Sequence, residues 1–131
     1  MLLKFLMEFS KRKLVPYGID YKNECIDDLQ KNILPEYKNN FQVRYIDEFD
    51  FPDAPYDIII TNPFYSYPKM NEFKDKLLSV LSKDGIIIYR IHTDVLKHYK
   101  INKIADLLKL LGNCFTVSIG AGLWFATLKK N

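Results

Sequence analysis

The 131-residue sequence contains only two cysteines and no long hydrophobic run. Cys25 and Cys114 lie far apart and have no other Cys or His near them at ligand spacing, so neither a zinc site nor a disulfide framework is predicted. We expect both thiols to be reduced. The longest apolar stretch, residues 56–65, is interrupted by Asp57 and falls short of the roughly 20 residues that cross a bilayer. The sequence therefore predicts no metal, no disulfide and no transmembrane helix.

A signal peptide and a strong net charge are also missing. Residues 1–7 are apolar apart from Lys4, but this stretch is short and is followed at once by Glu8 and the basic run at 11–13, so a cytoplasmic protein is expected. The formal net charge of +3 is mild and would only assist an approach to nucleic acid. With 48% hydrophobic and 27% charged residues, the composition fits a single compact domain over residues 1–131.

What the sequence does contain is hydrophobic spacing that alternates between helix and strand. Helical periodicity covers residues 2–9, 25–33, 71–81 and 101–111, and strand patterns cover residues 14–19, 41–45, 56–61, 86–91, 115–119 and 123–128. The unbroken isoleucines at 58–60 suggest burial on both faces, Asp84 and Gly85 predict a turn, and the glycines at 120 and 122 predict a hairpin. The pattern indicates an α/β fold: a doubly wound, Rossmann-like, mostly parallel sheet that ends in a C-terminal antiparallel hairpin.

Four polar residues lie at or just past the ends of predicted strands: Asp20, Asp47, Asn62 and His92. In open α/β sheets, ligands bind beyond the carboxyl ends of the strands, so these side chains are expected to share one edge. Taken singly, each has a simpler interpretation. A strand-end Asp commonly caps a turn, Asn-Pro is a common turn signal, and a lone His is commonly a surface residue.

The segment Asn62-Pro63-Phe64-Tyr65, delivered by an apolar strand, resembles the (Asn/Asp)-Pro-Pro-(Tyr/Phe) signature of S-adenosylmethionine-dependent amino methyltransferases. Upstream, Tyr17-Gly-Ile-Asp20 resembles the acidic second motif of the class I Rossmann-like methyltransferases, and Arg44-Tyr-Ile-Asp47 resembles the third. The C-terminal hairpin agrees with that family. The resemblance covers nearly the whole chain.

The resemblance implies a role for each acceptor-side residue. The Asn62 side-chain oxygen and the Pro63 carbonyl would accept the two hydrogens of an amine, and Tyr65 would stack on the acceptor plane. Phe64, Tyr67 and His92 would help to bind the substrate. No metal is needed, because the positive charge of the sulfonium already activates the leaving group.

The resemblance also implies a cofactor site for S-adenosylmethionine. Asp20 would accept hydrogen bonds from both ribose hydroxyls, and Asp47 would accept one from the adenine amine. Ile19, Ile46 or Phe49 could sandwich the adenine.

Two departures from the family pattern stand out. Phe64 replaces the second proline, which frees a backbone N–H but removes neither proposed acceptor. No glycine precedes Gly18, so the sequence is expected to lack the family's first strand and glycine-rich loop, and to bind the cofactor weakly or not at all. A late start site, a truncated chain, a degenerate protein that keeps only the fold, or a permuted loop at residues 120–122 would each account for this.

The sequence leads to two functional hypotheses. The first is a methyltransferase-like protein that acts on an exocyclic amine, such as adenine N6 or another base amine in nucleic acid, or a protein glutamine. The alternative is a catalytically inactive Rossmann-like module that binds a partner or forms a homodimer.

Overall fold

The computed structural model describes residues 2–62, 70–98, 100–111, 115–118 and 120–130. The chain divides into two compact units, which we call unit 1 (Met1–Asp50) and unit 2 (Phe51–Asn131).

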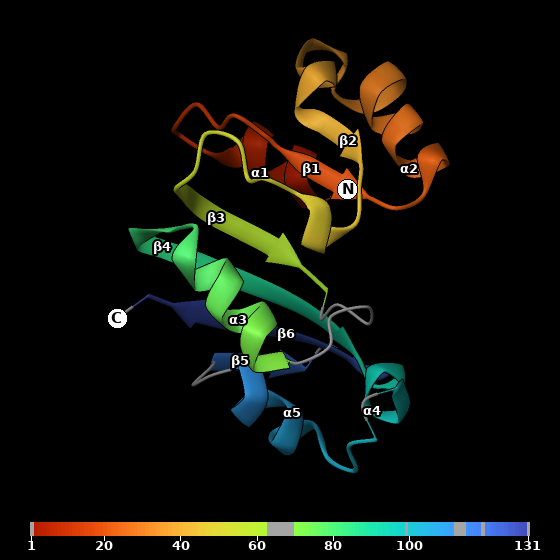
Figure 1. Cartoon of the computed structure of the whole chain (residues 1–131), viewed down its shortest axis with the longest axis vertical. Coiled ribbons are helices and arrows are strands. Elements are labelled where there is room, and N and C mark those ends of the chain that lie inside the picture. Colours follow the sequence, from red (N-terminus) through yellow and green to blue (C-terminus); the bar gives the residue numbers. More distant parts are fainter. Residues whose placement is uncertain (1, 63–69, 99, 112–114, 119, 131) are drawn as a thin grey trace. The chain divides into compact units, whose positions relative to one another are not determined.

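Unit 1 combines a two-stranded parallel sheet with short helices (Figure 1). Strand β1 registers with β2 from the pair Gly18 and Phe41 to the pair Asp20 and Val43. The elements in chain order are α1 (Leu2–Phe9), β1 (Gly18–Asp20), α2 (Asn23–Asp28), the π-helix η1 (Leu29–Ile33), the 3-10 helix η2 (Pro35–Asn40), β2 (Phe41–Val43) and the 3-10 helix η3 (Ile46–Glu48).

The core of unit 1 is small and is supported by side-chain hydrogen bonds to the backbone. Ile26, Leu34 and Phe41 are buried together. The Gln30 side-chain amide donates to the carbonyls of Lys38 and Phe41 at 3.0 and 2.9 Å. Such bonds satisfy backbone groups that short, irregular elements leave unpaired.

The strands of unit 1 are shorter than the sequence predicts. The strand expected at 14–19 is β1, Gly18–Asp20, and the one expected at 41–45 is β2, Phe41–Val43. Pro16 has no N–H to donate to a ladder, which explains why residues 14–17 stay outside the sheet. The prediction that Asp47 ends a strand is wrong, because it lies in η3.

Unit 2 contains a four-stranded mixed sheet in the order β3-β4-β6-β5. Strands β3 and β4 run parallel, whereas β4 with β6 and β5 with β6 run antiparallel, which confirms the C-terminal hairpin. The elements are β3 (Tyr56–Thr61), α3 (Met70–Ser79), β4 (Leu81–His92), α4 (Asp94–His98), α5 (Ile104–Leu111), β5 (Phe115–Ser118) and β6 (Leu123–Lys129). The described residues thus form two sheets with two parallel pairs, rather than the one continuous, mostly parallel sheet that was expected.

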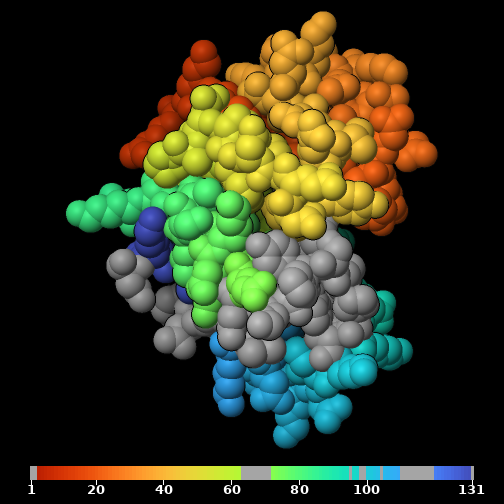
Figure 2. All heavy atoms as spheres, in the orientation of Figure 1, coloured from red at the N-terminus to blue at the C-terminus, as the bar shows by residue number. Residues whose placement is uncertain are grey.

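The core of unit 2 lies between one face of this sheet and helices α3 and α5. Along β4, Ile87, Tyr89 and Ile91 are fully buried and alternate with more exposed residues. Phe73 from α3 and Leu107 from α5 are also fully buried. Helix α3 contacts β4, and Figure 2 shows atoms of α3, in light green, on the face that is turned to the viewer.

Three features of unit 2 differ from the sequence prediction. Ile58 is 40% exposed, so β3 is not buried on both faces along its length. The turn predicted at Asp84 and Gly85 lies inside β4, because a register shift between the pairs Tyr56–Leu81 and Ile58–Ile86 absorbs the extra residues. Helix α4 was not predicted.

Candidate functional site

In unit 1, the predicted cofactor residues lie at the end of β1 and in the segment at η3 that follows β2. Asp20 is the last residue of β1, and its backbone carbonyl accepts a hydrogen bond from the Arg44 N–H at 3.0 Å. The Asp20 carboxylate oxygen Oδ1 accepts a hydrogen bond from the Lys22 N–H at 2.8 Å. Asp20 therefore caps the turn after β1, as the simpler interpretation holds, and keeps its second carboxylate oxygen for another donor.

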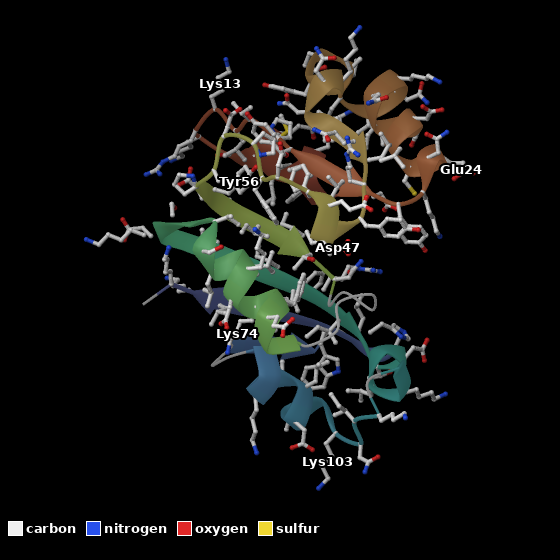
Figure 3. The ribbon with its side chains drawn as sticks, viewed as in Figure 1. Lys13, Glu24, Asp47, Tyr56, Lys74 and Lys103 are labelled. Carbon is white, nitrogen blue, oxygen red and sulfur yellow. The ribbon has the colours of Figure 1, made fainter. Side chains whose placement is uncertain are left out.

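The other predicted cofactor residues differ in exposure. Ile46 is buried, whereas Asp47, its neighbour on η3, is exposed (Figure 3). Ile19 and Phe49 are half-buried. Of the three apolar residues expected beside an adenine, Ile46 presents the least surface.

Two aromatic residues at this edge of unit 1 escaped the sequence analysis. Tyr21 directly follows Asp20, and Tyr45 lies two residues before Asp47. Their rings are stacked with an interplanar angle of 5° and centroids 6.2 Å apart, and both side chains are at least half exposed. The Lys22 ammonium lies 5.7 Å from the Tyr21 ring centroid. The signal that could have found them is an aromatic residue within two positions of each predicted cofactor acid.

In unit 2, the parallel pairing of β3 and β4 places Asn62 and His92 at the same edge of the sheet. Thr61 registers with Tyr89, so Asn62 leaves the sheet beside Arg90, and His92 is the last residue of β4. Asn62 is exposed, and its backbone carbonyl accepts a hydrogen bond from the Thr61 hydroxyl at 2.8 Å. The structure therefore brings these two predicted residues to one edge of unit 2.

Four predicted residues, Pro63, Phe64, Tyr65 and Tyr67, lie outside the described residues. Their roles stay predictions.

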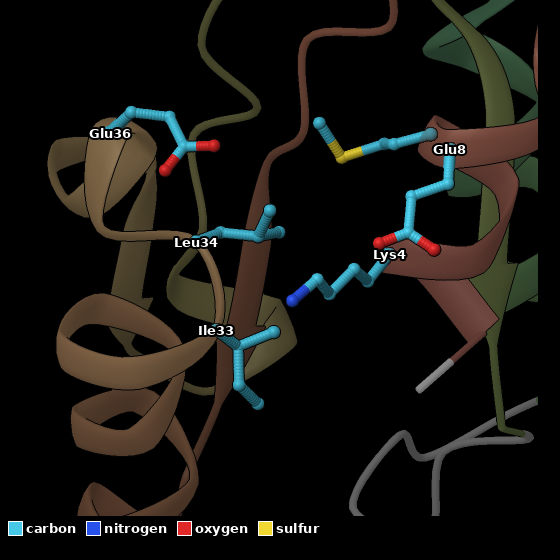
Figure 4. A pocket seen from close by; sticks show the side chains of 6 residues that line it. Lys4, Glu8, Ile33, Leu34 and Glu36 are labelled. Carbon is cyan, nitrogen blue, oxygen red and sulfur yellow. The ribbon is translucent and has the colours of Figure 1, made fainter.

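A separate cleft in unit 1 has a volume of ≈ 360 Å³ and is shown in Figure 4. Its floor is apolar, its rim is charged, and no predicted site residue lines it; the lining residues are Lys4, Met7, Glu8, Ile33, Leu34 and Glu36. Within the described ranges, no group of three or more His, Cys, Asp and Glu side chains is arranged to hold a metal ion. None of the helices described is long and apolar enough to cross a membrane.

Neither a protein-family model nor a curated protein matches this sequence. Solved structures do match the fold. A provisionally assigned rRNA methylase from Clostridium thermocellum has a TM-score of 0.68 at 13% identity over 98% of this chain and 82% of that one. The N-methyltransferase NodS from Bradyrhizobium japonicum, in complex with S-adenosyl-L-homocysteine, has a TM-score of 0.60 at 14% identity over 95% and 69%.

The plantazolicin methyltransferase BpumL, also solved with S-adenosylhomocysteine, has a TM-score of 0.65 at 17% identity over 99% of this chain and 72% of that one. Identities this low show a common fold and no more. The chain is therefore structurally similar to the class I S-adenosylmethionine-dependent methyltransferases.

Proposed function

We propose that the chain is an S-adenosylmethionine-dependent methyltransferase-like protein that acts on an exocyclic amine of a nucleic-acid base, such as adenine N6. The observation that carries this proposal is the position of Asn62 at the carboxyl end of β3, beside the end of β4, in a chain with a methyltransferase-like fold. Such an edge is where open α/β sheets bind their ligands.

The proposed cofactor residues belong to unit 1. The free oxygen of Asp20 would accept hydrogen bonds from the ribose hydroxyls, and Asp47 would accept one from the adenine amine, with Ile19, Ile46 and Phe49 close in sequence to these acids. The exposed, parallel rings of Tyr21 and Tyr45 provide a flat aromatic surface suited to the adenine. When bound, S-adenosylmethionine supplies an activated methyl group.

The proposed acceptor residues belong to unit 2. The Asn62 side-chain oxygen and the Pro63 carbonyl would accept the two amine hydrogens, which keeps the nitrogen lone pair directed at the methyl group. Tyr65 would stack on the base, with Phe64 and Tyr67 beside it.

The distribution of charge supports a nucleic-acid acceptor. Residues 1–50 contain eight Lys and Arg against nine Asp and Glu, a net charge of −1, whereas residues 51–131 contain eleven against seven, a net charge of +4. The unit that carries Asn62 is thus the basic one, as expected of a surface that approaches phosphates.

The test is methyl transfer from labelled S-adenosylmethionine to RNA, DNA and protein lysate. We expect Asn62→Ala to lower turnover by about 10²-fold, because the lost acceptor matters most as the amine develops positive charge. Asn102→Ala, at another exposed asparagine of unit 2, is the matched control and should leave turnover unchanged. Unchanged turnover in Asn62→Ala would refute the assignment of Asn62.

One observation favours the alternative, an inactive binding or dimerisation module. Phe5 and Phe9 on α1 are more than half exposed and their rings stack with centroids 4.3 Å apart, and Val15 nearby in sequence is also exposed. Exposed apolar groups of this kind are typical of interaction surfaces. A parent protein that transfers no methyl group and sediments as a dimer would support this alternative.

A further inference from the structure

His92 contacts Asp94 through one ring nitrogen. Its Nδ1 lies 3.2 Å from the carboxylate oxygen Oδ2 of Asp94 and 3.3 Å from the backbone nitrogen of the same residue. The imidazole side chain is 46% exposed. The second ring nitrogen, Nε2, is thus on a ring that solvent and ligands can reach.

The two contacts of Nδ1 correspond to two tautomers. If Nδ1 carries the proton, it donates to the Asp94 carboxylate and the lone pair is on Nε2; if Nε2 carries the proton, Nδ1 accepts from the Asp94 N–H. A hydrogen bond to an ionised carboxylate is stronger than one between neutral groups. The first tautomer is therefore favoured, and it makes Nε2 a base.

The position of His92 places this base at the same sheet edge as Asn62. Tyr89 and Ile91 of β4 point into the core, so Arg90 and His92 lie on the other face. Thr61 registers with Tyr89, so Asn62 lies next to Arg90 and on the same face of the sheet. His92 is two residues after Arg90 and shares that face.

We propose that His92 accepts the proton that the amine releases, and that Asp94 is the positioning residue that orients the imidazole. This inference rests on the proposed function. As the amine nitrogen bonds to the methyl carbon, the carbon–sulfur bond breaks and its electron pair remains on sulfur. The nitrogen, now positively charged, regains the electron pair of one N–H bond as that proton leaves its hydrogen-bond acceptor and moves to Nε2. Asp94 then stabilises the imidazolium by its negative charge.

Among the residues that the structure describes, charged groups near His92 in the chain and in the sheet lie on β4 and α4. On β4, Arg90 lies on the same face as His92; α4 carries Asp94, Lys97 and the titratable His98. The residue opposite His92 on β6 is Leu123, and Asn62 follows β3; neither is charged. The carboxylate of Asp94 is thus the group that a substitution should test.

The first experiment reads the tautomer without any methyl transfer. In ¹⁵N-labelled protein, at a pH where His92 is neutral, the imidazole nitrogen shifts should show the proton on Nδ1 in the parent and a shift toward Nε2 in Asp94→Asn. Asp106→Asn, which removes an acid from the first turn of α5, is the matched control and should leave the His92 signals unchanged. A parent with the proton on Nε2 would overturn the proposal.

The second experiment measures the rate of methyl transfer against pH. We expect His92→Gln to lower kcat by about 10²-fold, with little change in KM, and to abolish the fall in rate at low pH that protonation of the base produces. Circular dichroism should show that the variant is folded. A low-pH fall that persists in His92→Gln overturns the role of His92 alone, whereas a parent that methylates no amine overturns the proposed function and this role together.

Discussion

The two units hold their strand-end residues by different means. In unit 1, Asp20 ends a three-residue strand, and its carboxylate is fixed by the N–H of Lys22, two residues away. In unit 2, His92 ends a twelve-residue strand in which Ile87, Tyr89 and Ile91 are fully buried. The His92 side chain, like that of Asp20, contacts a residue two positions further on, so the units differ in what anchors the strand: β4 is packed along its buried face, whereas β1 has only three residues.

The units also differ in charge, and the difference matches the proposed division of labour. Unit 1 is nearly neutral, with a net charge of −1, and carries the exposed tyrosine pair. Unit 2 has a net charge of +4 and carries Asn62 and His92. An uncharged adenine can be held by flat aromatic surface, whereas a nucleic-acid acceptor brings phosphates that a basic surface attracts.

The largest loss of stability is expected from a substitution in the core of unit 2. Phe73→Ala removes a fully buried ring, and we expect it to lower the free energy of unfolding by about 3–5 kcal/mol. Phe9→Ala in unit 1 is the matched control; Phe9 is 71% exposed, so the change should stay within about 0.5 kcal/mol. The single tryptophan, Trp124 on β6, provides a fluorescence signal for urea titrations. Equal losses in the two variants would contradict a core centred on α3.

The difference between the long strands of unit 2 and the short strands of unit 1 also explains how much of the fold could be predicted from the sequence. In unit 2, the bounds of β3 and the C-terminal hairpin were predicted from runs of β-branched and aromatic residues between turn signals. Such runs favour a strand over other secondary structure. In unit 1 the strand bounds failed because three-residue strands carry too few residues for a period to be read. The π-helical turn at Leu29–Ile33 has the same apolar spacing as an α-helix, so the sequence could not distinguish them.

The candidate site was predictable to a similar, partial degree. Asp20, Asn62 and His92 were found because each closes a strand that the pattern predicted. Tyr21 and Asp94 were missed for physical reasons. An aromatic residue after a strand usually packs in a core. An acid two residues from a histidine contacts the imidazole only if the backbone turns between the two residues. The Asp94 contact depends on α4, which the sequence did not indicate.

A smaller effect tests whether long-range backbone contacts order the edge of unit 2. Thr93, directly after His92, donates its N–H to the Gly122 carbonyl at 2.8 Å. Gly122 has a φ of +72°, and an added Cβ would lie 2.4 Å from the Thr93 hydroxyl oxygen. We expect Gly122→Ala to cost about 2–4 kcal/mol in the free energy of unfolding, from backbone strain and overpacking together.

Gly120→Ala is the matched control for this glycine. Its φ is +85°, but an added Cβ meets no atom within 4 Å, so only the backbone strain of about 1–2 kcal/mol should be lost. Chemical denaturation of the two variants measures the difference. Equal costs at the two positions would mean that the contact with Thr93 does not order the end of β4.

The smallest effect concerns the tyrosine pair of unit 1. If Tyr21 and Tyr45 flank the adenine, Tyr21→Ala should weaken the binding of S-adenosylhomocysteine by about 0.5–1.5 kcal/mol, or roughly 2- to 12-fold, because stacking contributes that much beyond the area it buries. Tyr21→Phe keeps the ring and should bind as the parent does. Calorimetry is the measurement. Binding by Tyr21→Ala that equals the parent would contradict a role for the ring pair in holding the adenine, and would make the contact between Lys22 and Tyr21 a feature of the turn after β1.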